Sequence, residues 1–269
     1  LFPYTPLFRS KMLEAARARF AGAYALRAYL PVSHAARSLR NTLRRLRGKA
    51  AAPVTRLPQA AWPQVLKHRP IELTEIAKSD GNVRLSELAV LALAAREAAP
   101  GSEIVEIGTF DGRTALNLAI NAPPGVSIAT LDLPPDQMSA LTIEASERRY
   151  VDKPAPGARL RQCGEAWRPA AGRVVQMHGD SATFDWSAHV GRAGLVFVDG
   201  SHAYDYAKKD SETAMRLVMP GGLVLWHEYG VWPGVTQALE ELEASRRLGR
   251  VNIRDSSLVF WRAHQGADS

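Results

Sequence analysis

From about residue 84 onward the chain alternates short apolar segments with helical patterns, and this alternation limits the fold more than any other feature. Strands that are apolar on both faces and separated by helices form a mostly parallel sheet covered on both sides. We therefore expect an α/β fold. The expected strands are residues 103–107, 126–131, 174–178, 195–198 and 223–226, with two more at 251–253 and 258–261.

The segments between these strands repeat apolar residues at the spacing of helices. Helices are expected at residues 86–98, 113–121, 204–217 and 235–247, with a weaker helical pattern at 140–150. Pro220, Gly221 and Gly222 predict a turn before the strand at 223–226. The remainder of 135–170 is polar, and we expect it to shape the binding site of an acceptor.

Polar residues follow every one of the first five expected strands. They are Glu106 to Gly112, Asp132, Gly179 to Ser181, Asp199 to His202, and His227 with Glu228. In open parallel sheets, ligands bind beyond the carboxyl ends of the strands, where the strand order reverses. The sequence therefore predicts one ligand site at this edge of the sheet.

The first of these loops contains Gly108 and Gly112, which allow a tight turn and a close approach of the backbone to a ligand. It is neither the G-x-G-x-x-G of dinucleotide-binding proteins nor a phosphate-binding P-loop. Asp132 follows the second strand, where a carboxylate can accept both hydroxyls of a ribose. Asp180 follows the third strand and can accept from an adenine amino group. A plain turn, a surface aspartate and an Asx-turn are the respective alternatives.

The ordered motifs EIGTFDG, LDL, GDS, FVDGSHAYDYAKKD and PGGLVLWHEYG resemble the class I S-adenosylmethionine-dependent methyltransferases. Within that class the chain is most similar to the branch of catechol-type O-methyltransferases and related bacterial small-molecule and sugar methyltransferases. The resemblance covers residues 84–263. It implies a Rossmann-like, doubly wound, seven-stranded sheet of order 3-2-1-4-5-7-6 in which strand 7 is antiparallel.

The resemblance also implies which residues bind S-adenosylmethionine. Glu106, Gly108 and Gly112 would line its methionine part, Asp132 the ribose, and Asp180 with Ser181 the adenine. Thr109 and Phe110 belong to the same loop and are further cofactor-binding candidates. Phe110 stands where many relatives have glycine, although the catechol-type branch accepts a bulky residue at this position.

A divalent metal is the second implication. In the resembling family an acid after strand 4 and a pair after strand 5 hold Mg²⁺, and the matching residues are Asp199, His227 and Glu228. His227 stands where the family often has an acid, and imidazole is a poor ligand for Mg²⁺. The sequence therefore leaves open a weak site, a site for Mn²⁺ or another metal, and a vestigial site.

His202 lies three residues after Asp199, where catechol-type relatives carry a lysine that acts as the base. A histidine with a pKa near neutrality can take a proton from a hydroxyl, so His202 and Asp199 are the catalytic candidates. Capping of the following helix is the structural alternative for His202. Tyr204, Tyr206 and Trp226 are candidates for a substrate pocket or for the core.

The predicted function is an S-adenosylmethionine-dependent methyltransferase that methylates a hydroxyl of a small molecule or sugar. Two alternatives stay open at this point. The first is an enzyme similar to the cephalosporin hydroxylases on the same fold, which share the DGSHxY stretch and the PGG turn. The second is a non-catalytic, membrane-associated module that binds a cofactor.

Positive charge is concentrated near the start of the chain. Residues 1–70 carry 14 Lys and Arg against one acid, whereas residues 71–269 carry 20 against 26. We expect a basic helical extension at 11–50 that contacts a membrane surface or an acidic partner through residues 12–50, followed by a linker and lead-in at 51–83. Because the predicted domain at 84–269 is mildly acidic, nucleic acid is not an expected partner. Residues 1–10 resemble a translated sequencing adapter and are interpreted as an artefact.

Cys163 is the only cysteine, which excludes an internal disulfide and metal sites built on several thiolates. A reducing, cytoplasmic setting is the expectation. The longest apolar run, residues 88–95, is far shorter than the roughly 20 residues of a membrane-spanning helix.

Overall fold

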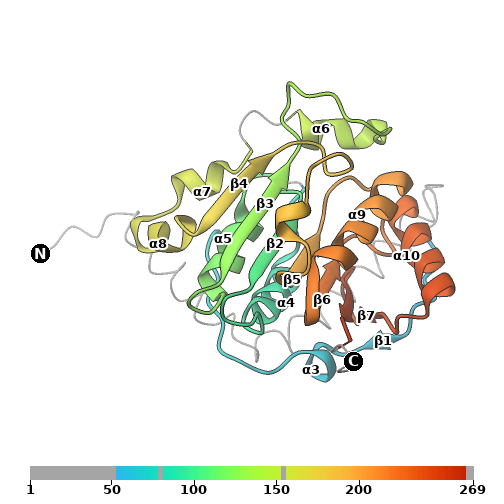
Figure 1. Ribbon diagram of the computed structural model, residues 1–269, viewed down its shortest axis with the longest axis horizontal. Helices are drawn as coiled ribbons and strands as arrows, with labels where there is room; N and C mark the ends of the chain where they lie inside the picture. The colour runs from blue at the N-terminus through green and yellow to red at the C-terminus, as the bar shows by residue number, and fades with distance from the viewer. Residues whose placement is uncertain (1–52, 78–80, 153–155, 265–269) are drawn as a thin grey trace, which may run out of the picture.

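The computed structural model describes residues 53–77, 81–152 and 156–264, so the predicted artefact and basic helical extension lie outside the described residues. The described chain contains one eight-stranded sheet of order β1-β7-β8-β6-β5-β2-β3-β4 (Figure 1). The strands are β1 (Gln59–Ala60), β2 (Glu103–Ile107), β3 (Ser127–Asp132), β4 (Val174–His178), β5 (Ala193–Val198), β6 (Val218–Trp226), β7 (Val251–Ile253) and β8 (Val259–Arg262).

Seven of these strands have the predicted order, and β8 is antiparallel to both β6 and β7 as expected for the seventh strand. The eighth strand, β1, comes from the predicted linker and pairs in parallel with β7 at the edge of the sheet. Its two residues are too short a segment to show an apolar alternation, so the sequence pattern gave no sign of it.

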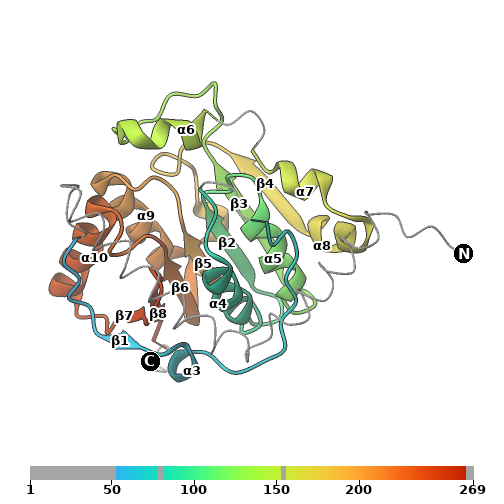
Figure 2. The same ribbon diagram turned by 180° about the vertical axis from the view of Figure 1, so that it is seen from behind.

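Helices cover both faces of the sheet. They are α3 (Trp62–Val65), α4 (Leu85–Ala95), α5 (Arg113–Asn121), α6 (Arg148–Val151), α7 (Ala158–Gln162), α8 (Arg168–Ala171), α9 (Tyr204–Leu217) and α10 (Pro233–Arg246). Seen from behind in Figure 2, α4 and α5 lie in front of the sheet, and α9 and α10 cover its other face.

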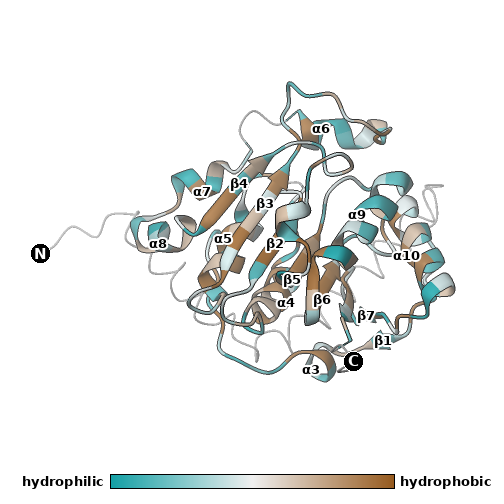
Figure 3. Cartoon of the chain, in the orientation of Figure 1, coloured by the Kyte–Doolittle hydropathy of each residue, from teal (hydrophilic) through white to brown (hydrophobic). Residues whose placement is uncertain are grey.

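Alternate strand residues enter the two cores, which explains why the strands are apolar throughout. On β2, Ile104 packs into the core under α4, whereas Val105 and Ile107 pack into the core under α9 and α10. Figure 3 shows the same division, with mostly apolar colouring on the central strands and hydrophilic colouring on the outer side of α9. Burial of apolar surface on both faces holds the helices to the sheet.

Two predicted elements differ from the structure. The expected turn at Pro220 to Gly222 lies inside β6, because Ala193 pairs with Val218 and Leu195 with Leu223, which leaves the extra residues as a bulge. The expected helix at 140–150 is wrong over its first half. A 3₁₀ turn, Ala145–Glu147, leads into the single turn of α6.

The segment predicted to be a linker is packed against the domain. The backbone of Thr74 donates to the Asn117 side chain of α5 and accepts from it, at 2.9 and 3.1 Å. Asn121, one helical turn further on, makes the same two bonds with the backbone of Glu72, at 3.0 and 2.7 Å. These bonds dock the segment along α5 and bring residues 81–83 to the carboxyl edge of the sheet.

Arg113, at the start of α5, strengthens this attachment. Its buried guanidinium donates to the backbone carbonyls of Glu75 and Val83 at 2.6 and 2.8 Å. None of the helices that the structure describes is both long enough and apolar enough to cross a membrane.

Candidate active site

A cavity of about 300 Å³ lies at the carboxyl edge of the sheet, within the usual size of small-molecule sites. Loops from all five central strands line it, together with residues 81–83 and part of the segment before and within α6. We call the part formed by the loops after β2, β3 and β4 the β2–β4 half. The part formed by the loops after β5 and β6 is the β5–β6 half.

Gly108 is the point at which the two halves touch. Its φ is +101°, and a Cβ atom there would lie 2.1 Å from the backbone oxygen of Asp199. Only glycine can occupy this position without moving one of the two loops. Beside it, the hydroxyl of Thr109 bonds that of Thr130 at 2.6 Å inside the core.

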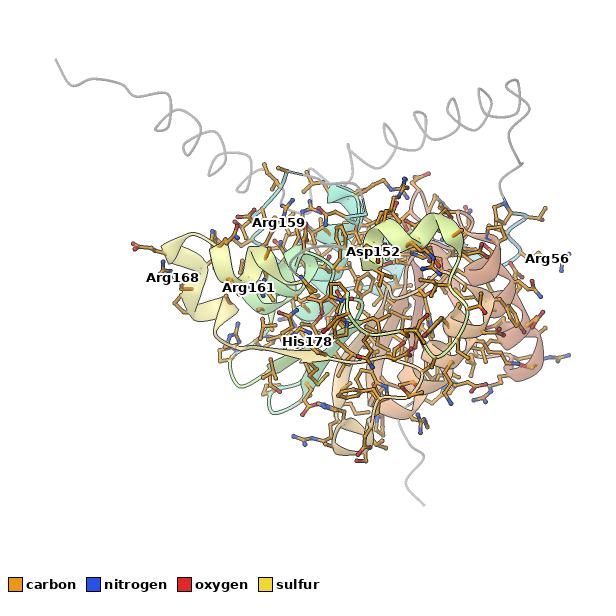
Figure 4. The ribbon with its side chains drawn as sticks, turned by 90° about the horizontal axis from the view of Figure 1, so that it is seen from above. Arg56, Asp152, Arg159, Arg161, Arg168 and His178 are labelled. Atoms are coloured by element: carbon orange, nitrogen blue, oxygen red, sulfur yellow. The ribbon has the colours of Figure 1, made fainter. Side chains whose placement is uncertain are left out.

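Asp132, the last residue of β3, joins the first two loops. The backbone N–H of Phe110 donates to its Oδ2 atom at 2.6 Å. Asp111, the residue after Phe110, forms an ion pair with Arg159 of α7 at 2.9 Å. Figure 4 shows Arg159 next to Arg161 as seen from above. The loop after β2 is thus fixed from both sides.

Asp180 anchors the third loop. Its Oδ1 atom accepts the N–H of Ala182 at 2.8 Å, which is an Asx-turn contact. Its Oδ2 atom accepts the N–H of Ala140 at 2.6 Å and the hydroxyl of Tyr206 at 2.5 Å. One carboxylate therefore shapes its own loop and also ties the segment after β3 to the sheet edge.

Two of the predicted cofactor residues do not line the cavity. Gly112 begins α5 with φ +86° and faces Leu160 of α7. Glu106 is fully buried in β2, where the Thr130 hydroxyl donates to its Oε2 atom at 2.5 Å. Burial raises the pKa of Glu106 well above its ordinary value, against the lowering effect of the Thr130 hydrogen bond. The remaining six, Gly108, Thr109, Phe110, Asp132, Asp180 and Ser181, all line the cavity.

In the β5–β6 half, His227 lies between two carboxylates. Its Nδ1 atom is 2.8 Å from Oδ1 of Asp199, and its Nε2 atom is 3.2 Å from Oε2 of Glu87 on α4. Burial alone lowers the pKa of His227, but the charges of Asp199, Glu228 and Glu87 outweigh it and raise the pKa well above its ordinary value. The ring is therefore an imidazolium at neutral pH.

His202 belongs to a second pair. Its Nδ1 atom lies 2.6 Å from Oε1 of Glu147, its Nε2 atom lies 3.8 Å from Oδ1 of Asp199, and its ring stacks on Trp232 at 4.8 Å. Burial lowers the pKa of His202, but the two carboxylates raise it to about 9. The sequence led us to expect a ring that titrates near neutrality, whereas this one is protonated there.

Glu228 is the least engaged carboxylate of the cavity. Its Oε1 atom lies 3.6 Å from Nδ1 of His227, and its buried Oε2 atom has no hydrogen-bond partner among the described residues. Its φ of +64° is an uncommon backbone conformation for a non-glycine residue, and such residues cluster at functional sites.

Residues 105–229 match the family model described as a methyltransferase domain. The match covers 125 of the 269 residues, and this segment is similar to a methyltransferase domain. This match confirms the resemblance predicted from the sequence motifs. A comparison with curated proteins found no significant match.

Solved structures with a similar course of the chain include methyltransferases. TomG of Streptomyces achromogenes, an O-methyltransferase of tomaymycin synthesis solved with S-adenosylmethionine, is 22% identical, with 72% of this chain and 84% of that chain covered and a TM-score of 0.45. PaMTH1 of Podospora anserina, bound to S-adenosylhomocysteine, is 17% identical, with 70% and 81% covered and a TM-score of 0.49. We infer the reaction from the site itself.

The predicted metal ligands, Asp199, His227 and Glu228, do not fit a metal ion. Within the parts of the chain that the structure describes, no three His, Cys, Asp or Glu side chains are grouped so that they could hold one. Both ring nitrogens of His227 already face carboxylates, which leaves no lone pair to donate to a metal.

Several residues of the site carry no motif that the sequence could have revealed. Glu87, Glu147 and Trp232 reach the β5–β6 half from α4, from the turn before α6 and from the residue before α10. Of the aromatic candidates, Tyr206 lines the cavity, while Trp226 is buried and donates to Ser211 at 2.9 Å. Tyr204 bonds Glu241 on the surface instead.

Proposed function

We propose that this chain is an S-adenosylmethionine-dependent methyltransferase that methylates an oxygen of a small molecule. The observation that carries the proposal is that six of the predicted cofactor residues line one cavity, within the segment that matches a methyltransferase domain. They come from three different strand ends, so no single motif brings them together.

The residues of the β2–β4 half fit an adenosyl amino acid. Asp132 offers a carboxylate at the end of β3, where a ribose is expected, and Asp180 with Ser181 lies at the end of β4 beside it. Because position 108 has no side chain, the loop after β2 can lie directly against the loop after β5, so that both line one cavity. These features support this half as the cofactor site.

The β5–β6 half is suited to hold an acceptor hydroxyl. When bound, S-adenosylmethionine supplies an electrophilic methyl group, so the protein mainly has to orient the acceptor and receive its proton. Asp199, His202 and Glu228 line this half, and Glu147 raises the basicity of the His202 ring. A stronger base is a useful partner for a weakly acidic hydroxyl, although only a small fraction of it is deprotonated at neutral pH.

Calorimetric titration with S-adenosylhomocysteine tests the cofactor assignment. We expect one site in the wild type and an affinity lowered about tenfold or more by Asp132→Ala, since a bidentate charged hydrogen bond is lost. Asp185→Ala removes an exposed carboxylate on the loop after β4 and serves as the matched control, with unchanged affinity. A wild type that releases no heat with millimolar ligand would contradict the proposal.

The same titration separates the two halves. His202→Ala should change the affinity for S-adenosylhomocysteine by less than about twofold, because its partners lie in the β5–β6 half. An affinity loss equal to that of Asp132→Ala would show that His202 supports the cofactor site and does not serve the acceptor.

A further inference from the structure

Glu87 is a buried carboxylate whose two oxygens are both occupied. The backbone N–H and the hydroxyl of Ser257 each donate to its Oε1 atom at 2.8 Å. Arg84, just before α4, donates from its guanidinium to both oxygens, at 2.6 and 3.0 Å. Glu87 is therefore fixed in position, with one face of Oε2 directed at the ring of His227.

The hydrogen bonds of His227 define its state. Carboxylate oxygens only accept hydrogen bonds, so a ring whose two nitrogens both face carboxylates has to donate from both. That requires two N–H groups and a positive charge. The ring, at 5% exposure, is held by Glu87 on one side and Asp199 on the other.

We infer that the His227 imidazolium, fixed between Glu87 and Asp199, supplies a positive charge beside Asp199 in place of a divalent metal ion. A cation bound between Asp199 and Glu228 would lie next to this imidazolium, since the Nδ1 atom is 2.8 Å from one carboxylate and 3.6 Å from the other. Like charges at such distances repel strongly in a buried site.

Without a metal ion to bind, the carboxylate of Glu228 is left to accept a hydrogen bond from a ligand. Its Oε2 atom lacks a hydrogen-bond partner within the described chain, and the residue lines the cavity. With the imidazolium neutralising Asp199, Glu228 is the carboxylate that accepts a hydrogen bond from the acceptor hydroxyl. This inference rests on the proposed methyltransferase function, and its test uses a different ligand.

Titration of the full chain with MnCl₂, in the presence of S-adenosylhomocysteine, tests the inference. The wild type should bind no Mn²⁺ up to about 1 mM, a concentration at which weak carboxylate sites are occupied. The double variant E87Q/H227D places two acids after β6, as in the resembling family. It also removes the charge of Glu87, which would otherwise be left without its His227 partner. It should gain one Mn²⁺ site, with an affinity at least about tenfold above that of the wild type.

Two results would overturn the inference. The first is one equivalent of Mn²⁺ bound by the wild type. The second is a double variant that still binds S-adenosylhomocysteine but gains no Mn²⁺ site, because the histidine would then not stand in for a metal. If the wild type fails to bind S-adenosylhomocysteine, that result contradicts the proposed function and not this inference.

A measurement on the wild type alone covers the case in which the double variant does not fold. In protein labelled with ¹⁵N-histidine, both ring nitrogens of His227 should carry a proton at neutral pH, with His227→Gln used to assign the signals. A nitrogen without a proton would leave a lone pair for a metal ion and would contradict the inference.

Discussion

In the β2–β4 half of the cavity, carboxylates accept hydrogen bonds mainly from backbone N–H groups, whereas in the β5–β6 half they face the rings of two histidines. Asp132 accepts from the backbone of Phe110, and Asp180 accepts from the backbone of Ala182. Across the cavity, Glu87 and His227 are 140 positions apart in the chain, and Glu147 is 55 positions from His202.

The halves also differ in charge. The β2–β4 half is formed by carboxylates and backbone amides, which suits a ligand with hydroxyl and amino groups to donate. The β5–β6 half pairs two imidazolium rings with four carboxylates, Glu87, Glu147, Asp199 and Glu228. In the proposed function, the first half holds the cofactor and the second fixes charges around the acceptor.

A fully buried glutamate lies behind each half, Glu106 on β2 and Glu87 on α4, and replacing each of them in turn is the strongest test of the comparison. Glu87→Gln should cost about 4 kcal/mol of unfolding free energy, because it leaves the His227 charge buried with one partner fewer. Glu106→Gln should cost less than about 1 kcal/mol, since Glu106 is held neutral by burial and an amide can replace its hydrogen bond to Thr130. Urea denaturation measures both. Equal costs would mean that charge does not distinguish the halves.

Gly108 offers a smaller but more local test at the contact between the halves. Gly108→Ala should destabilise the fold by about 2–3 kcal/mol, because the added Cβ collides with the Asp199 backbone in addition to straining its own. Gly101→Ala is the matched control. It also has a positive φ, of +80°, but its Cβ would meet nothing within 4 Å, so only about 1 kcal/mol is expected. Similar losses at both positions would show that the two loops can move apart.

Asp210 of α9 lies below both halves and makes stability depend on pH. Burial, with the charge of Asp180 adding to it, raises its pKa from 3.8 to about 7. The folded state thus holds this proton more tightly than the unfolded state. Asp210 then lowers stability by up to about 1.4 kcal/mol per pH unit as pH rises between these two values, with no further loss above.

Denaturation of Asp210→Asn across this pH range checks the effect. The variant cannot ionise, so its stability relative to the wild type should increase with pH up to about 7. Asp205→Asn, an exposed position on the same helix, should follow the wild type at every pH. A constant difference between Asp210→Asn and the wild type would mean that Asp210 is not titrating in this range.

The order of the seven main strands was an implication of the family resemblance. The β2–β4 half could be predicted because strand, loop and carboxylate follow one another directly in the sequence. Asp132 and Asp180 are examples: Asp132 ends one recognisable strand, and Asp180 follows the next by two residues. Glu87 and Glu147 could not be predicted in the same way. Each lies in a segment whose role depends on packing against a loop far along the chain, and nothing in its own neighbours indicates that contact.

The protonation states could not be predicted from residue type either. A histidine such as His202 has an ordinary pKa near neutrality, and only its position between Glu147 and Asp199 changes that. The two-residue strand β1 was missed for a related reason, since its pairing with β7 is a property of the folded chain.

The pairing of Asn117 and Asn121 with Thr74 and Glu72 has a geometric consequence. Four residues of helix advance about 6 Å, and two residues of extended chain advance about 6.6 Å, so the two repeats are nearly commensurate. The spacing of the two asparagines on the helix therefore fixes the register of the extended segment along it. A shift of the segment by one residue would break both amide pairs at once. The number of residues between Thr74 and the cavity wall at 81–83 is therefore set by this register.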